Sequence, residues 1–150
     1  EKLKKHPLAR ALRVDKMTIA ALRETLWAYR DGERAREQVP VLAMLGAPED
    51  ALRARAEKLR LALAEAGAQA QTVPTEGQVG GGSCPTQLVR SWAVAVDPGA
   101  LTVDALAEKL RRSPLPIIGR ISQGQYLLDV RTLLEEDVDD ICRAVKEAVS

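Results

Sequence analysis

Residues 116–132 place two apolar runs on either side of a two-residue turn signal, and no other feature constrains the fold as strongly. The runs are PIIGRIS (116–122) and QYLLDVRT (125–132), and the turn is Gln123–Gly124. A connection of two residues joins strands only as a β-hairpin, so the two predicted strands must pair antiparallel. This pairing indicates an α+β arrangement rather than a doubly wound parallel sheet.

Apolar residues spaced by three and four predict four helices in the rest of the chain. The predicted helices cover residues 15–31, 48–66 and 102–112, and a last one carries Val138, Ile141, Val145 and Ala148 on one face. In the first helix the shared face consists of Ile19, Leu22, Leu26 and Tyr29. Asp15 and Gly32 are its predicted N-cap and C-cap, Thr102 is expected to cap the third helix, and Gly67 should end the second.

Alternating apolar and polar residues predict two more strands, over 68–73 and 89–97, with a loop over 75–88 between them. Residues 33–39 are expected to connect, and Pro40 to open a short apolar turn. The fold prediction is therefore α+β, with an antiparallel or mixed sheet and helices packed on one face. We expect residues 1–46 to form a helical arm and residues 47–150 a compact α+β domain.

The charge is uneven although the net charge is only +1. Residues 1–16 carry six Lys or Arg against Glu1 and Asp15, a local excess of four, which leaves the other 134 residues at −3. A local basic end is typical of an arm or an anion site. Aromatic residues make up 3% of the chain, too few for a base-stacking platform.

Cysteine and histidine are scarce, which argues against several kinds of site. With two Cys and one His, neither a disulfide framework nor a metal site is expected, and both thiols should be reduced. We find no apolar run long enough to span a membrane and expect no signal peptide. His6 is interpreted as a polar spacer rather than a general base, and Cys84 has no basic partner that would make it a nucleophile.

The glycine-rich stretch GQVGGGSCP (77–85) offers a second kind of candidate site. Glycines let backbone amides approach a phosphate, but a nucleotide loop needs a following Lys and a helix, and neither is present here. The stretch is either a flexible connection between strands or a loop over a neighbouring active site. In the second case Gly80, Gly81, Gly82 and Ser83 are the candidate residues.

Arg10 and Arg13 are the candidate anion-binding residues. In a helical segment, residues three apart share a face, so two planar guanidinium groups can grip one phosphate-like anion. The alternative is a solvated helix face, as we expect for the pairs Arg34/Arg36 and Arg111/Arg112.

Four stretches together resemble the C-terminal part of bacterial selenocysteine synthase, the L-seryl-tRNA(Sec) selenium transferase family. They are HPLARALRVDKMTIAALRETLWAYRD, QVGGGSCP, SWAVAVD and PIIGRISQGQYLLDVRTLLEED, in this order over nearly the whole chain. ALRVDK and QVGGGS carry most of the similarity. Where this chain has Cys84, the family usually has an apolar residue.

The resemblance implies the small C-terminal domain of a fold-type I pyridoxal 5′-phosphate (PLP) enzyme, with residues 1–46 as the linker from the large domain. The family's Schiff-base lysine lies upstream of residue 1, so this chain alone would be an inactive fragment. The reaction replaces the seryl hydroxyl of seryl-tRNA(Sec) with selenium from selenophosphate, and the resemblance assigns selenophosphate binding to Arg10 and Arg13. It also implies a cytoplasmic homo-oligomer with no membrane or DNA partner.

Two other functions remain open from the sequence. A related PLP-dependent lyase would use the same arginines to hold a small phosphorylated substrate. A non-enzymatic α+β module would use the basic arm to contact RNA or protein.

Overall fold

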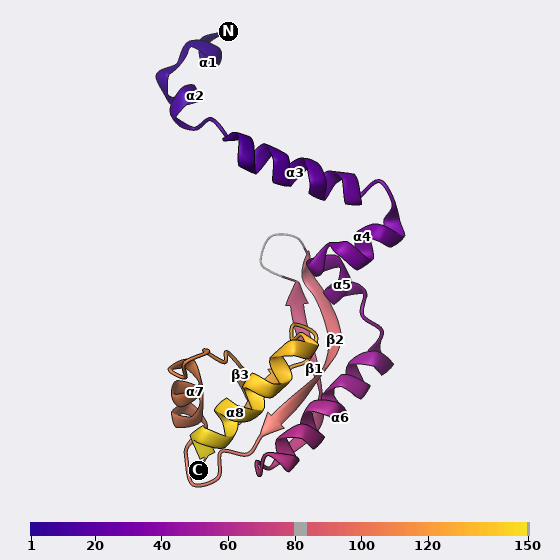
Figure 1. Cartoon of the computed structure of the whole chain (residues 1–150), viewed down its shortest axis with the longest axis vertical. Coiled ribbons are helices and arrows are strands. Elements are labelled where there is room, and N and C mark those ends of the chain that lie inside the picture. Colours follow the sequence, from indigo (N-terminus) through magenta and orange to yellow (C-terminus); the bar gives the residue numbers. More distant parts are fainter. Residues whose placement is uncertain (80–83, 150) are drawn as a thin grey trace. The chain divides into compact units, whose positions relative to one another are not determined.

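The structure is a computed structural model that describes residues 1–79 and 84–149. The chain divides into two compact units, Glu1–Gly46 and Ala47–Ser150, which are described separately below (Figure 1). No helix in the described part of the chain is long and apolar enough to cross a bilayer.

The first unit is entirely helical. Its elements are α1 (Lys2–Lys5), α2 (Pro7–Ala11), α3 (Lys16–Ala28), α4 (Gly32–Gln38) and α5 (Pro40–Gly46). The predicted cap of α3 is confirmed, because the Asp15 carboxylate accepts hydrogen bonds from the backbone N–H and the hydroxyl of Thr18, both at 2.9 Å.

The predicted end of this helix is wrong, since α3 stops at Ala28 and Gly32 begins α4 instead of capping α3. The cause is a second N-cap. The Asp31 carboxylate accepts from the backbone N–H groups of Glu33 and Arg34, so residues expected to connect form a helical turn instead. The apolar stretch after Pro40 is likewise helical.

The apolar face of α3 is exposed within this unit. Ile19, Leu22, Leu26 and Tyr29 share the predicted spacing, and each exposes half of its surface or more. The only buried residues of Glu1–Gly46 are Ala28 and Ala35. The periodicity therefore predicts the helix correctly, but no apolar layer inside the unit covers its face.

The second unit begins with α6 (Glu49–Glu65), whose predicted buried face is confirmed. Leu52, Ala56, Leu59 and Leu63 are each at most 2% exposed. Two acids in the first turn complement the helix dipole. Gly67 ends the helix with a φ of 91°, the left-handed conformation that glycine adopts without a steric penalty.

A long hairpin follows, made of β1 (Ala70–Val79) and β2 (Cys84–Val96). The prediction of a loop over 75–88 is wrong for most of its length. Thr75 through Gln78 pair with Ser91 through Leu88, and the register shifts between Gln78 and Val79. The composition of this polar, glycine-containing stretch favours a loop, but hydrogen bonds between the two strands keep it extended.

The predicted C-terminal hairpin is confirmed, with shorter strands than expected. β3 (Arg120–Ser122) and β4 (Gln125–Asp129) pair antiparallel, and Gln123 and Gly124 have φ values of 51° and 73° between them. All strand pairs are antiparallel, in the order β1-β2-β4-β3. The α+β prediction is thus confirmed.

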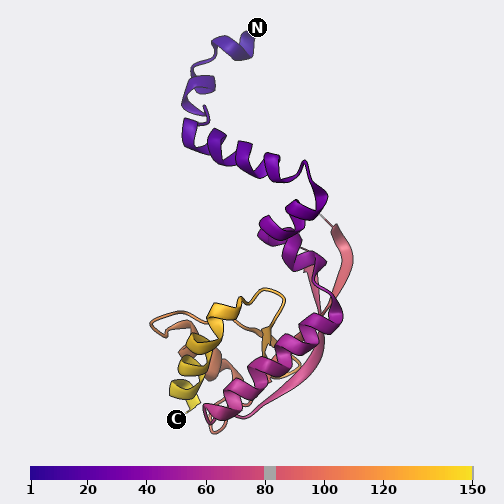
Figure 2. The ribbon, with the colours of Figure 1, turned by 45° about the vertical axis from the view of Figure 1, so that its right-hand side comes forward.

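Three helices cover one face of this sheet: α6, α7 (Val103–Arg111) and α8 (Val138–Val149), the last preceded by a 3-10 turn, η1 (Glu135–Asp137) (Figures 1 and 2). Thr102 caps α7 as predicted, by accepting from the Ala105 N–H. The core joins their buried residues to alternate strand positions, namely Val94, Val96, Tyr126, Leu128 and Val130. Of the predicted α8 face, Ile141, Val145 and Ala148 are buried and Val138 packs against the core.

The opposite face carries a separate small cluster of Ala93, Ala95 and Leu127, with Val73 beside it. Arg120 of β3 donates from Nη1 to the Glu76 carbonyl oxygen at 2.9 Å and from Nη2 to the Thr75 hydroxyl. Because β3 and β1 are the two outer strands of the sheet, this side chain ties its edges together across the open face.

Candidate anion site

Arg10 and Arg13 lie on two sides of the C-terminus of α2. His6 caps this helix, since its Nδ1 accepts from the Leu8 N–H at 3.2 Å, which is a more definite structural role than the spacer predicted for it. Arg10 lies in the last turn, and Arg13 follows the C-cap residue Leu12. The expectation that one helix carries both arginines is therefore wrong: only Arg10 is helical, and a single backbone turn, in which the Arg13 N–H donates to the Arg10 carbonyl at 3.3 Å, joins them.

Both arginines are exposed, and neither has an acidic partner among the residues that the structure describes. The carboxylate nearest in sequence is Asp15, which is occupied in capping α3. The hydrogen bonds from the Thr18 N–H and hydroxyl lower the pKa of Asp15. The guanidinium groups are therefore available to an external anion, with two forks one backbone turn apart.

The other predicted residues have different positions. Gly80, Gly81, Gly82 and Ser83 lie outside the described residues, between the ends of β1 and β2. Cys84 is the first residue of β2. The second thiol, Cys142, is free, and partial burial raises its pKa, so it has no thiolate character.

The pairs expected to be solvated are exposed. Arg34 donates to the Gln38 side chain at 3.0 Å, and Arg112 forms an ion pair with Glu108 at 2.8 Å. Exposed contacts of this kind contribute little to stability.

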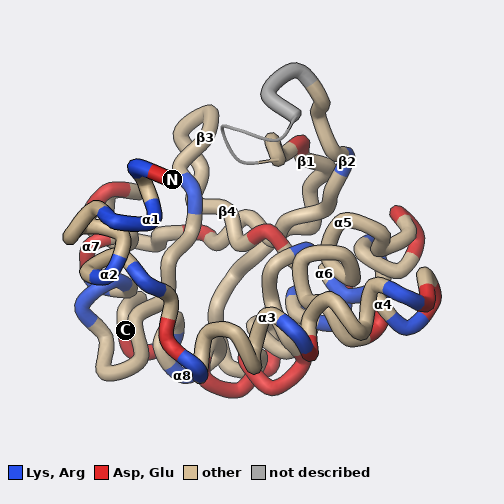
Figure 3. The backbone as a smooth tube through the Cα atoms, turned by 90° about the horizontal axis from the view of Figure 1, so that it is seen from above, with Lys and Arg blue, Asp and Glu red and all other residues tan. Residues whose placement is uncertain are grey.

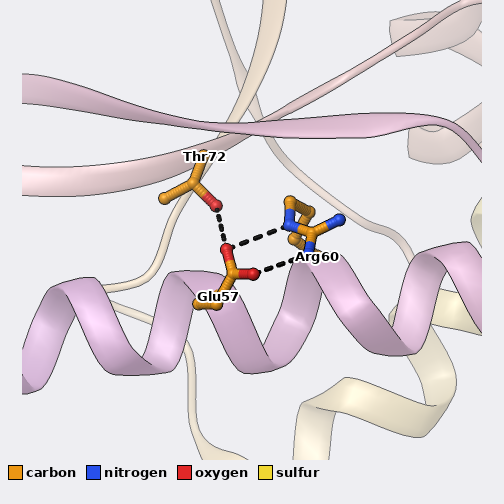
Figure 4. A network of polar contacts seen from close by, with 3 residues as sticks. All are labelled: Glu57, Arg60 and Thr72. Carbon is orange, nitrogen blue, oxygen red and sulfur yellow. Dashed lines mark hydrogen bonds and ion pairs between the residues drawn. The ribbon is translucent and has the colours of Figure 1, made fainter.

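A hollow of about 550 Å³ lies at the end of the sheet in the second unit, lined by parts of α6, β1, β2 and the β3–β4 turn. Among the described residues that line it, Arg60 is the only cation, and both oxygens of Glu57 already bind it, at 2.9 Å and 2.5 Å (Figure 4). The Thr72 hydroxyl donates to the same carboxylate. Because Glu57 neutralises Arg60, this hollow is a weaker candidate for anion binding than the segment with Arg10 and Arg13.

Sequence reasoning missed the contacts on the open face of the sheet. Ser91, which is 2% exposed, donates to the Asp129 carboxylate at 2.6 Å, and the same carboxylate accepts from the Arg131 N–H. Arg120 reaches residues 44 and 45 positions away. No local pattern marks partners at such separations, so the sequence carries no signal for them.

Known proteins similar to this chain match over nearly its full length. A model of the family described as SelA, L-seryl-tRNA selenium transferase, matches residues 1–134. An L-seryl-tRNA(Sec) selenium transferase of Moorella thermoacetica is 43% identical over 147 residues, which cover 96% of this chain and 31% of that protein. One of Geobacter sulfurreducens is 40% identical over 151 residues, covering 99% and 33%. The chain spans about a third of the length of the curated relatives it matches.

The fold and the site define an α+β domain joined to a basic helical segment with two exposed arginines that have no acidic partner among the described residues. With the family match over residues 1–134, the chain belongs to the L-seryl-tRNA selenium transferase family.

Proposed function

We propose that this chain is the C-terminal part of a PLP-dependent enzyme that converts seryl-tRNA(Sec) into selenocysteyl-tRNA(Sec), with selenophosphate as the selenium donor. The observation that carries the proposal is the match to selenium transferases over nearly the whole chain, in the segment that contains Arg10 and Arg13. The α+β fold is compatible with the small domain of a fold-type I enzyme, with residues 1–46 as its linker. The whole enzyme would be a cytoplasmic homo-oligomer.

The lysines of this chain do not fit a covalent PLP site. All seven are exposed; Lys58 pairs with Glu135, and Lys109 donates to the Ala148 carbonyl oxygen. A Schiff-base lysine needs a pocket that desolvates its amine and encloses the cofactor. The covalent site therefore belongs to another part of the enzyme, and the role proposed for this chain is to bind the anionic donor.

Arg10 and Arg13 can perform that role through charge and shape. Selenophosphate presents several oxygens in the geometry that two guanidinium forks bind, and arginine stays protonated at any physiological pH. Because no carboxylate of the described residues pairs with them, the arginines give up none of the ion pairs found there when the donor arrives. Both positive charges would hold the donor beside the seryl group and stabilise the phosphate that leaves.

The test uses the full-length enzyme that contains this segment, with Arg10→Ala and Arg13→Ala compared with Arg34→Ala. Arg34 is an exposed arginine of the same helical unit, and its side chain bonds only to Gln38 in the described structure. Loss of one anion-contacting charge should raise the activation free energy of selenium transfer by about 2–4 kcal/mol, which lowers the rate about 30- to 1000-fold. PLP absorbance should not change in any of the three variants.

Rates equal to that of Arg34→Ala in both variants would refute the role of the two arginines. A wild-type enzyme that forms no selenocysteyl-tRNA(Sec) would refute the proposed function itself.

A further inference from the structure

Lysines crowd the segment immediately before the two arginines. α1 contributes Lys2, Lys4 and Lys5, all exposed, and the acids of residues 1–16 are Glu1 and Asp15 alone. Figure 3, which draws Lys and Arg in blue, shows basic positions along both α1 and α2. Positive charge on this segment thus continues well beyond the two arginines proposed to bind the donor.

These lysines have no anionic partner in the part of the chain that the structure describes. The ion pairs found there all lie in Ala47–Ser150, as in the pairs Lys58–Glu135 and Arg143–Asp140. Lys2, Lys4 and Lys5 also make no side-chain hydrogen bond among those found there. Like charges so close together repel one another, and a bound polyanion would relieve that repulsion.

From these observations we propose that Lys2, Lys4 and Lys5 contact the backbone phosphates at the 3′ end of seryl-tRNA, a contact separate from the donor site. The inference rests on the proposed function. An aminoacyl group is esterified to the last nucleotide of its tRNA. To meet a donor held by Arg10 and Arg13, the seryl group must bring the phosphates of the preceding nucleotides close to the same arginines.

The chain length makes this contact geometrically possible. Lys5 and Arg10 are five positions apart, and a trans chain spans at most about 3.5 Å per residue, or roughly 17 Å. The terminal phosphates of an RNA that delivers its 3′ end to Arg10 therefore come within reach of α1.

The residue types also indicate what kind of contact this is. All four aromatic side chains of the protein, Trp27, Tyr29, Trp92 and Tyr126, lie outside residues 1–16. The segment has no Trp, Tyr or Phe ring on which a base can stack, and the imidazole of His6 is engaged in capping α2, so the lysines recognise phosphate charge and not base identity. The contact should therefore be insensitive to the terminal base sequence and strongly sensitive to salt.

The experiment measures tRNA binding by the full-length enzyme as a function of salt concentration. The test variant is Lys2→Gln/Lys4→Gln/Lys5→Gln, and the charge-preserving variant replaces the same three lysines with arginine. The control, Arg55→Gln/Arg111→Gln/Arg112→Gln, removes three exposed cations from Ala47–Ser150 and leaves the same net charge. None of the three variants changes a residue assigned to the donor site.

Each lost single-strand phosphate contact reduces the magnitude of the negative slope of log K against log salt by about 0.7, so the loss of three contacts reduces it by about 2. At 0.1 M salt this corresponds to roughly a hundredfold weaker binding of seryl-tRNA. The arginine variant should keep the wild-type slope, and the control should change it by much less. The KM for selenophosphate and the PLP absorbance should stay at wild-type values.

A glutamine variant with the wild-type slope, or with the same change as the control, would overturn the inference. So would a variant whose slope is unchanged but whose oligomeric mass falls, because the lysines would then contact protein. The salt slope and the oligomeric mass can both be measured without turnover. An inactive wild-type enzyme that still shows the expected slopes would refute the proposed function and leave the RNA contact standing.

Discussion

Replacing Gly119 with alanine should destabilise the α+β unit, because the new methyl group would meet a buried ring. A Cβ at Gly119 would lie 2.4 Å from Cζ of Tyr126 and 2.7 Å from its Cε1 and hydroxyl oxygen. Tyr126 is 1% exposed. Its hydroxyl accepts from the Gly119 N–H at 2.7 Å and donates to the Ile117 carbonyl at 3.1 Å, so the ring cannot withdraw without breaking both hydrogen bonds.

The size of the effect follows from these contacts. Overpacking a filled core costs about 1–3 kcal/mol, and each hydrogen bond lost contributes about 1 kcal/mol. We therefore expect Gly119→Ala to lower the free energy of unfolding by about 3 kcal/mol. With an m-value of about 2 kcal/mol/M, the urea midpoint measured by circular dichroism would fall by about 1.5 M.

Gly77→Ala is the matched control for this measurement. Gly77 lies in the same sheet, and a Cβ built there meets no atom within 4 Å. Its substitution should change the free energy of unfolding by less than about 1 kcal/mol, and the reduced backbone entropy of the unfolded chain favours a gain. Equal midpoints for the two variants would show that the Tyr126 ring adjusts freely, which would refute the reasoning.

Three further predictions concern the same unit. Arg120→Ala should remove both hydrogen bonds to β1 and speed amide hydrogen exchange in that strand. Arg120→Lys lacks the planar guanidinium and should restore protection only in part. Unchanged exchange in the alanine variant would show that Arg120 does not hold the two outer strands together. Hydrogen bonds from Arg60 lower the pKa of Glu57, so this carboxylate stabilises the fold above the ordinary glutamate pKa of about 4.3 and loses that effect as the pH falls toward its lowered value. Urea midpoints of Glu57→Gln should accordingly fall less between pH 5 and pH 3 than those of the wild type, and parallel pH profiles would exclude the linkage. Leu63→Ala should lower the free energy of unfolding, measured by thermal or urea unfolding, by about 2–5 kcal/mol. Leu61 is 49% exposed on the same helix, and Leu61→Ala should lower it by under about 1 kcal/mol. Similar losses in the two variants would show that burial does not determine the stability lost.

The local elements were predictable from the sequence wherever neighbouring residues determine them. The α6 helix, its buried face and its end at Gly67 follow from periodicity and from the preference of glycine for a left-handed φ. The β3–β4 turn at Gln123–Gly124 follows from the two-residue spacing. The family likewise follows from ordered local motifs, and the match over residues 1–134 confirms it.

Elements that depend on competing local signals were predicted less well. Gly32 suggested the end of a helix, but Asp31 just before it supplies the side-chain acceptor that starts α4. Thr75–Gln78 has a loop-like composition, yet pairing with β2 satisfies its backbone groups and keeps it extended. In both cases the hydrogen bonds that form in the structure, and not the local composition, account for the conformation.

The sequence by itself determined the helices of the second unit, the antiparallel hairpin, the α+β class and the local excess of positive charge before residue 16. Only the tertiary structure decided that Arg120 ties the two outer strands together and that Gly119 must lack a side chain beside Tyr126. It also decided that Arg60 is neutralised while, among the described residues, no acid pairs with Arg10. The physical reason is the distance along the chain over which each kind of interaction acts. Helix periodicity, caps and turns act over about four residues, whereas these contacts join residues brought together only when the sheet and its helices pack.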